Sequence, residues 1–132
     1  MAGSLKIDNL TTDNGLTLTG GARSTPCTTT PGLTYTAGTI TLDLNAANNF
    51  EVGLANNATL ANPTNLSVGQ SGVIFVRQTI GSNTLSYGSF YKFQGNTAPT
   101  LSTAINGIDA LTYYVANSTT IIVDAITNLV GT

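Results

Sequence analysis

The chain has 132 residues, the length of about one domain, and only 8% of them are charged, against roughly 25% in an average globular protein. Its net charge is −2 and its four basic residues are scattered, which argues against nucleic acid or an anionic membrane as a partner, because both attract basic clusters. Lys, Glu, Gln, Arg and Met are scarce while Thr, Asn and Gly are frequent, so the composition predicts an all-β fold.

Targeting and redox features are few. No apolar run approaches the ~20 residues that span a bilayer, and the start "MAGSLKIDNL" lacks the basic-then-apolar order of a secretory signal. The single cysteine, Cys27, excludes an intrachain disulfide. Because the chain has no histidine, it offers no imidazole base to activate the Cys27 thiol as a nucleophile. We therefore expect synthesis in a reducing cytoplasm without export.

The first part of the chain predicts a short N-terminal arm. Apolar and polar residues alternate in Leu5–Asp8 and again in Leu16–Thr19, as in half-buried strands. The following stretch, Gly20–Gly32, contains two prolines and reads as a loop. We expect residues 1–32 to form an N-terminal arm and loop, and residues 33–132 to form one β-sandwich body.

The body begins with clear alternation. In Thr39–Leu44, "TITLDL", every second residue is Ile or Leu, which predicts a strand with those side chains inward. Phe50–Leu54 repeats the pattern after the turn-forming "NAANN". The next stretch is polar and predicts at most a short strand around Leu60.

The segment Val73–Val76, "VIFV", is apolar at every position. Such a run predicts either a central strand or a strand with one face covered by a partner chain. The aromatic stretch Tyr87–Phe93, "YGSFYKF", raises the same question. Phe90 and Tyr91 fall on opposite faces of a strand, so the two cannot both fill a two-layer core. Core filling and a contact surface remain the alternatives, and we expect one face to meet a partner subunit.

The last part of the body predicts a hairpin. Apolar and polar residues alternate in Ile108–Val115, which predicts the first strand. Residues 116–118 form a turn, and Thr119–Asp124 forms the second strand. Tyr114 should point away from the core, and Asp109 should act as a hydrogen-bonding residue at a turn or strand edge. Residues 125–132 fit either a last strand or a tail. The candidate subunit-contact residues of the whole chain are Val73, Phe75, Phe90, Tyr91 and Tyr114.

Catalytic and metal-binding patterns are weak. The six acidic residues are isolated in sequence, and only Asp43 and Glu51 could meet, across a hairpin, as a carboxylate pair for catalysis or Ca²⁺. The chain has no zinc spacing, EF-hand loop or phosphate-binding glycine motif. We therefore expect no enzymatic activity, no cofactor and no metal.

An ordered set of segments in the body resembles a known family. "GQSGVIFVRQ" and "NTLSYGS" are followed by "TAPTLSTAINGIDALTYYVANSTTIIV", and the set extends over about Thr34 to Val123. The last of these segments is similar to the C-terminal signature of small β-rich virion proteins of tailed bacteriophages, and the upstream segments resemble the same family. The sequence departs from that pattern after the aromatic strand, where relatives often carry a Trp. The matching positions in the last segment are Gly95, Ala98, Pro99, Leu101, Thr103, Ile108, Asp109, Leu111, Thr112 and Tyr113.

The resemblance implies a β-sandwich or jelly-roll-like antiparallel module, commonly trimeric. It implies a non-enzymatic structural protein of the virion, made in the host cytoplasm, and we expect a capsid decoration (cement) or head-fibre subunit that docks on the major capsid protein. The alternatives are a tail-fibre or spike module and a carbohydrate-binding receptor-recognition module. Residues Met1–Gly21 would then add a strand to a neighbouring subunit or clamp the capsid.

Overall fold

The computed structural model describes residues 33–129, with side chains from Thr36 onward. The N-terminal arm predicted at residues 1–32 therefore lies outside the described residues, as do residues 130–132. The described elements are β1 (Leu33–Thr36), β2 (Thr39–Leu42), β3 (Asn49–Leu54), β4 (Ala58–Leu60), β5 (Ser71–Gln78), β6 (Leu85–Tyr87), β7 (Tyr91–Lys92), the 3-10 helix η1 (Gln94–Asn96), β8 (Ile108–Asn117) and β9 (Thr120–Leu129).

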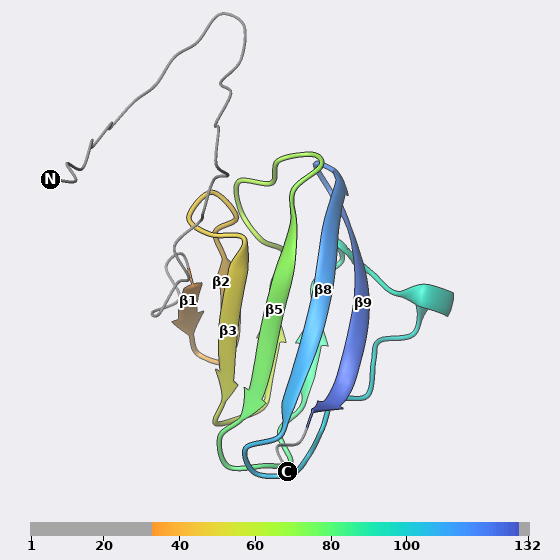
Figure 1. Cartoon of the computed structure of the whole chain (residues 1–132). Helices are drawn as coiled ribbons and strands as arrows, with labels where there is room; N and C mark the ends of the chain where they lie inside the picture. The colour runs from red at the N-terminus through yellow and green to blue at the C-terminus, as the bar shows by residue number, and fades with distance from the viewer. Residues whose placement is uncertain (1–32, 130–132) are drawn as a thin grey trace, which may run out of the picture.

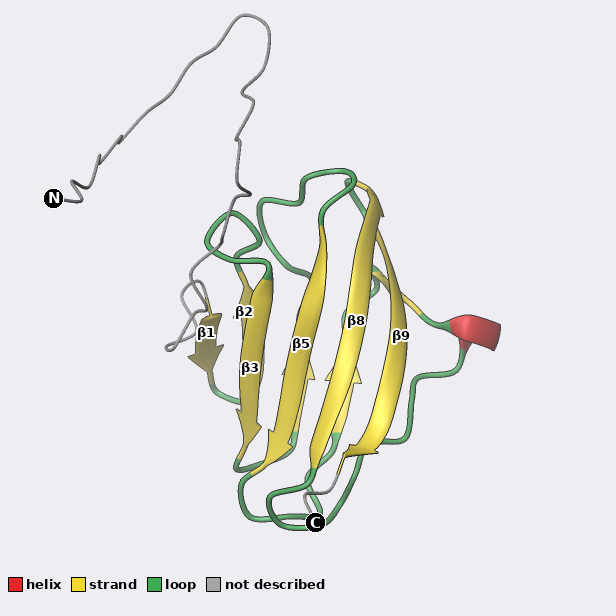
Figure 2. Ribbon diagram, viewed as in Figure 1, coloured by secondary structure: helices red, strands yellow, loops and turns green. Residues whose placement is uncertain are grey.

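These strands form two sheets that face each other across one apolar layer (Figures 1 and 2). The strand order is β1-β2-β4-β6 in the four-stranded sheet and β3-β5-β8-β9-β7 in the five-stranded sheet. The short helix η1 projects from the side of the molecule beyond β9 (Figure 2). The all-β prediction is confirmed.

The antiparallel part of the prediction is wrong for four of the seven strand pairings. β2 with β4, β4 with β6, β3 with β5, and β7 with β9 are parallel, while β1–β2, β5–β8 and β8–β9 are antiparallel. The reason is that consecutive strands from β2 to β7 alternate between the two sheets. The crossovers of β2–β4, β3–β5 and β4–β6 thus pass through the opposite sheet, where an α/β protein would use a helix, whereas β7 connects to β9 through η1 and β8.

Alternation places the core side chains as the sequence indicates. In β3 the burial pattern strictly alternates, with Phe50, Val52 and Leu54 inward. In β5, Ile74 and Val76 are buried while Val73 and Phe75 point to the other face. β5 lies between β3 and β8 and is therefore central in its sheet, but Phe75 is 43% exposed, so the strand is not buried on both faces within the described residues.

The hairpin β8–β9 is the longest element pair, with ten residues in each strand. The strand continues through Leu129, so the first part of the 125–132 stretch is a strand. A bulge near its end pairs Ile126 with Ala110 but Leu129 with Ile108, and Asn128 within it has a φ of 59°. Asn tolerates this left-handed conformation better than most residues.

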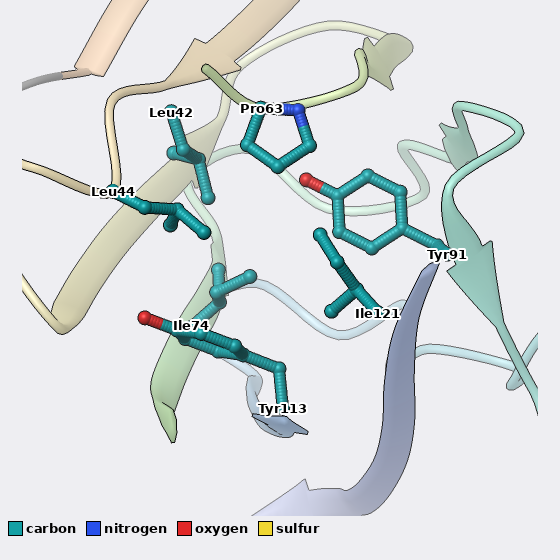
Figure 3. A pocket seen from close by; sticks show the side chains of 7 residues that line it. All are labelled: Leu42, Leu44, Pro63, Ile74, Tyr91, Tyr113 and Ile121. Carbon is teal, nitrogen blue, oxygen red and sulfur yellow. The ribbon is translucent and has the colours of Figure 1, made fainter. Parts of the chain in front are cut away.

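Two tyrosines close the core between the sheets. Figure 3 shows Tyr91 and Tyr113 entering the same apolar space, with Tyr91 directed toward Pro63. The Tyr91 hydroxyl donates to the carbonyl of Ala61 at 3.2 Å, and the Tyr113 hydroxyl donates to that of Asn48 at 2.8 Å. These bonds satisfy both hydroxyls, so the space is packed core.

Gly72 permits the close approach of the 45–48 turn to β5. A Cβ at this position would overlap the carbonyl oxygen of Asn48 and would touch the Tyr113 ring at 3.0 Å. The same carbonyl accepts the Tyr113 hydroxyl. The lack of a side chain at Gly72 therefore allows the turn to hydrogen-bond the core tyrosine.

Replacement of Gly72 by alanine should lower the free energy of unfolding by about 2–3 kcal/mol, because backbone must move to relieve the overlap. Gly53→Ala is the matched control, since a Cβ there meets only the Thr79 methyl at 3.4 Å. Urea unfolding of both variants measures the difference. Equal stability of the two variants would contradict the proposed role of Gly72.

Candidate interaction surface

The outer face of the five-stranded sheet carries two apolar rows, on either side of a row formed by Val73, Thr112 and Asp124. Strand register places Phe75, Ala110 and Ile126 in one row and Tyr114 beside Ile122 near the other end. Facing residues on neighbouring strands have Cβ atoms about 5 Å apart, so these side chains are in contact range. The exposed fractions are 43% for Phe75, 47% for Tyr114, 54% for Ile122 and 56% for Ile126. We define the outer patch as Val73, Phe75, Ala110, Tyr114, Ile122 and Ile126.

Charged residues lie at two sides of the outer patch. Glu51 on β3 is in register with Phe75, and its carboxylate forms an ion pair with Arg77 of β5. On the other side, Lys92 of β7 is in register with Ile122, and Asp124 lies between Ile122 and Ile126 along β9. The Glu51–Arg77 pair is about half exposed and contributes little to stability. Each side of the patch thus carries both signs of charge.

The structure brings together three of the five predicted contact residues. Val73, Phe75 and Tyr114 belong to the outer patch, with Val73 half-buried. Phe90 is half-buried and packs against the core. Tyr91 is only 6% exposed, and its ring lies inside the core beside Leu42, Pro63 and Ile121. The prediction that Phe90 and Tyr91 cannot both fill the core is wrong, because β7 begins at Tyr91 and Phe90 precedes the strand. As a single subunit, the chain does not present the Tyr91 ring on its surface.

Sequence reasoning missed Ile122 and Ile126. Both lie on β9 on the face opposite Ile121 and Val123, and the alternation "IIVDAI" contains that signal. The outward position of Ile126 could not be assigned from this alternation, because the residues after Asp124 fit a tail as well as a strand.

The proposed meeting of Asp43 and Glu51 is wrong. Asp43 follows β2 in the four-stranded sheet, whereas Glu51 belongs to β3 in the other sheet. The Asp43 carboxylate instead accepts hydrogen bonds from the Asn45 amide at 3.0 Å and the Asn65 side chain at 2.8 Å. Within residues 33–129 no group of three or more His, Cys, Asp or Glu side chains could hold a metal ion.

Asp109 is a fully buried carboxylate that ties three segments together. It accepts hydrogen bonds from the amide of Ser102 at 2.8 Å, the hydroxyl of Ser102 at 2.7 Å, and the amide of Asn128 at 2.9 Å. The loop before β8 and the bulge of β9 are therefore held by one side chain. The expectation that Asp109 is a hydrogen-bonding residue is confirmed.

No helix in the described part of the chain is long and apolar enough to cross a membrane. Comparisons with protein-family models, with curated proteins and with solved structures found no match to this chain.

Removal of the Asp109 carboxylate should leave buried donors without an acceptor. Asp109→Ala is expected to lower the free energy of unfolding by about 2–4 kcal/mol, because hydrogen bonds to a charged group are lost and their donors stay buried. Asp43→Ala removes a carboxylate with two more exposed bonds and should cost about 1 kcal/mol or less. Denaturant unfolding compares them, and an equal loss in both would refute the special role of Asp109.

The core tyrosines predict loss of stability at alkaline pH. Burial raises the pKa of Tyr113 from 10.0 to about 12. The pKa values of Tyr87 and Tyr91 are raised further, mainly by burial and to a smaller extent by neighbouring groups, Asp109 beside Tyr87 and the other core tyrosines beside Tyr91. Above pH 10 the unfolded chain loses these protons first, so stability is complete below pH 10 and declines as pH rises, by about 1.4 kcal/mol per pH unit for each tyrosine.

Unfolding monitored by circular dichroism between pH 9 and pH 12 should show this decline, and the Tyr113→Phe variant should show a shallower one. An identical slope in the variant would contradict the assignment to Tyr113.

Proposed function

We propose that this chain is a non-enzymatic structural protein of a tailed-phage virion, a capsid decoration (cement) or head-fibre subunit that self-associates and docks on the major capsid lattice. The observation that carries the proposal is the exposed outer patch on a sheet that no third layer of the described residues covers. The phage assignment is supported by the ordered resemblance of the body to small virion proteins.

The outer patch has the physical features of a contact surface. It combines one aromatic side chain in each apolar row, Phe75 and Tyr114, with exposed isoleucines, and aromatic and aliphatic side chains bury large apolar area. Apolar burial contributes about 25 cal/mol per Å² before the costs of association. The row between the two apolar rows consists of Val73, Thr112 and Asp124, so a partner that covers this face must supply a positive or hydrogen-bonding group for the Asp124 carboxylate.

A second copy of the chain is the partner that the surrounding charges favour. Glu51 and Arg77 flank the patch on the β3–β5 side, and Lys92 and Asp124 flank it on the β9 side. When the β5 side of one copy meets the β9 side of another, each charge can lie opposite its complement. A head-to-tail contact forms a ring when the rotation between copies closes, and we propose a trimer around a three-fold axis.

One observation favours a second function, a carbohydrate-binding module of a tail fibre or spike. The half-exposed Tyr114 ring lies on the outer sheet face near Thr112 and Asp124, and these could supply stacking and hydrogen bonds to a sugar. A glycan array distinguishes the two functions. Specific binding that is lost in Tyr114→Ser, by a protein that stays monomeric, would favour the carbohydrate function over the decoration subunit.

The double variant Phe75→Ser/Tyr114→Ser should weaken self-association by about tenfold or more, because central aromatic anchors carry most interface energy. The isolated subunit should lose little stability, since both side chains are exposed. Light scattering is expected to give about 40 kDa for the native chain, three times 13.5 kDa, and a lower mass for the variant.

Ile80→Ser is the matched control, because Ile80 is 63% exposed but lies in a loop outside the patch. It should leave the mass unchanged. A native chain that remains a 13.5 kDa monomer at high concentration would overturn the self-association. Imaging of whole particles then tests the location, and copies confined to the tail would overturn the capsid assignment.

A further inference from the structure

The five-stranded sheet ends at an incomplete edge. β7 contributes only Tyr91 and Lys92, which pair in parallel with Ile121 and Ile122 of β9. Beyond this point the chain leaves the sheet into η1, while β9 continues to Leu129. Among the described residues, no strand pairs with β9 over Val123–Thr127 on the side away from β8. We call Val123–Thr127 the open edge.

A groove runs along the open edge. It has a volume of about 310 Å³, and its walls are the open edge on one side and the 93–100 loop on the other. Phe93 and Pro99 supply apolar surface from the loop, and Val123 and Ala125 supply it from the strand. An extended segment placed here would continue the line of β7, so the groove has the position of a missing strand.

The backbone of the open edge is directed into this space. The Ile121 amide donates to the carbonyl of Phe90, so odd-numbered residues of this part of β9 turn their hydrogen-bonding groups away from β8. The Ala125 amide points the same way and donates to the Asp124 carboxylate at 2.9 Å. A side chain therefore occupies the position that the carbonyl of an added strand would take.

The segment Leu5–Asp8 fits this edge in pattern and in charge. Its apolar residues alternate with polar ones, so an added strand would place Leu5 and Ile7 on the groove side beside Val123 and Ala125. Lys6 would then lie on the outer side, next to Asp124. An incoming carbonyl replaces the Asp124 carboxylate at the Ala125 amide, and the released carboxylate pairs with Lys6.

The positions of the two ends favour a segment from another copy. The described chain begins at β1, which lies at the opposite side of the sandwich from β9 (Figure 1). A segment of the same copy would have to pass around the body to reach the open edge. A neighbouring copy brought close by the outer patch has no such detour.

We propose that Leu5–Asp8 of a neighbouring copy adds as a strand to the open edge of β9, with Leu5 and Ile7 in the groove and Lys6 beside Asp124. This inference rests on the self-association proposed above. Strand addition to an open edge gives affinity through main-chain hydrogen bonds and specificity through alternate side chains.

A charge exchange in the full-length chain tests the Lys6–Asp124 contact. Lys6→Glu should weaken association at low salt by about twofold to fivefold, as expected for an exposed ion pair, and Asp124→Lys should restore it in the double variant. Lys6→Glu with Thr39→Lys and Thr59→Lys has the same net charge but places both new lysines on the exposed face of the four-stranded sheet, so it should not restore association. Failure of Asp124→Lys to restore more than this control would overturn the pairing.

Disulfide capture tests the strand position and its source. In a Cys27→Ser background, Lys6→Cys with Asp124→Cys should form a covalent dimer or higher species under mild oxidation, because facing residues on paired strands lie within disulfide range. Lys6→Cys with Thr59→Cys is the control and should give at most background yield. An intramolecular disulfide would overturn the exchange between copies, and background yield alone would overturn the strand addition.

The two proposals fail in different ways. If Phe75→Ser/Tyr114→Ser leaves association unchanged while Lys6→Cys and Asp124→Cys still cross-link between copies, the outer patch is wrong and the strand exchange stands. If Phe75→Ser/Tyr114→Ser abolishes association, and Lys6→Cys with Asp124→Cys gives no cross-link in a chain with an unchanged patch, the outer patch stands and the strand exchange is wrong.

Discussion

The packing of two sheets through a single apolar layer is the constraint on which the rest of this structure depends. Consecutive strands from β2 to β7 alternate between the sheets, so each crossover adds one inward-facing row to the same core. With no helices to cover either sheet, each sheet can bury only one of its faces in the described molecule. A strand that is apolar on both faces, as β5 is, must then leave one apolar row outside.

The long hairpin extends that outer row into a surface. β8 and β9 each have ten residues, and they align Tyr114 and Ile122 with the side chains of β5. The buried Asp109 carboxylate fixes the end of this surface, because it binds the amide of Asn128 in the β9 bulge. A buried polar contact at one end of the core thereby sets the position of exposed side chains on the other face of the sheet.

Sequence alternation predicted the inward faces of these strands because the two-residue period is local. It could not predict which strands pair, since pairing depends on where crossovers lead, and Asp43 and Glu51 ended in different sheets for this reason. Tyr91 shows the same limit: alternation predicts Phe90 and Tyr91 on opposite faces, but both pack against the core because Phe90 lies before β7. The outer patch was predictable at Phe75 and Tyr114, and alternation in the predicted strand Thr119–Asp124 already places Ile122 outward, while Ile126 required knowing that β9 continues past Asp124.

Asp124 connects the two surfaces on which the proposals rest. Its backbone belongs to the open edge of β9, and its position in the strand lies between Ile122 and Ile126 of the outer patch. In the isolated subunit its carboxylate occupies the Ala125 amide, which hinders unspecific pairing of one edge with another. A segment must therefore supply both a carbonyl for that amide and a positive charge for the displaced carboxylate. Few extended segments meet both conditions, so the same residue that blunts the edge can select the strand that joins it.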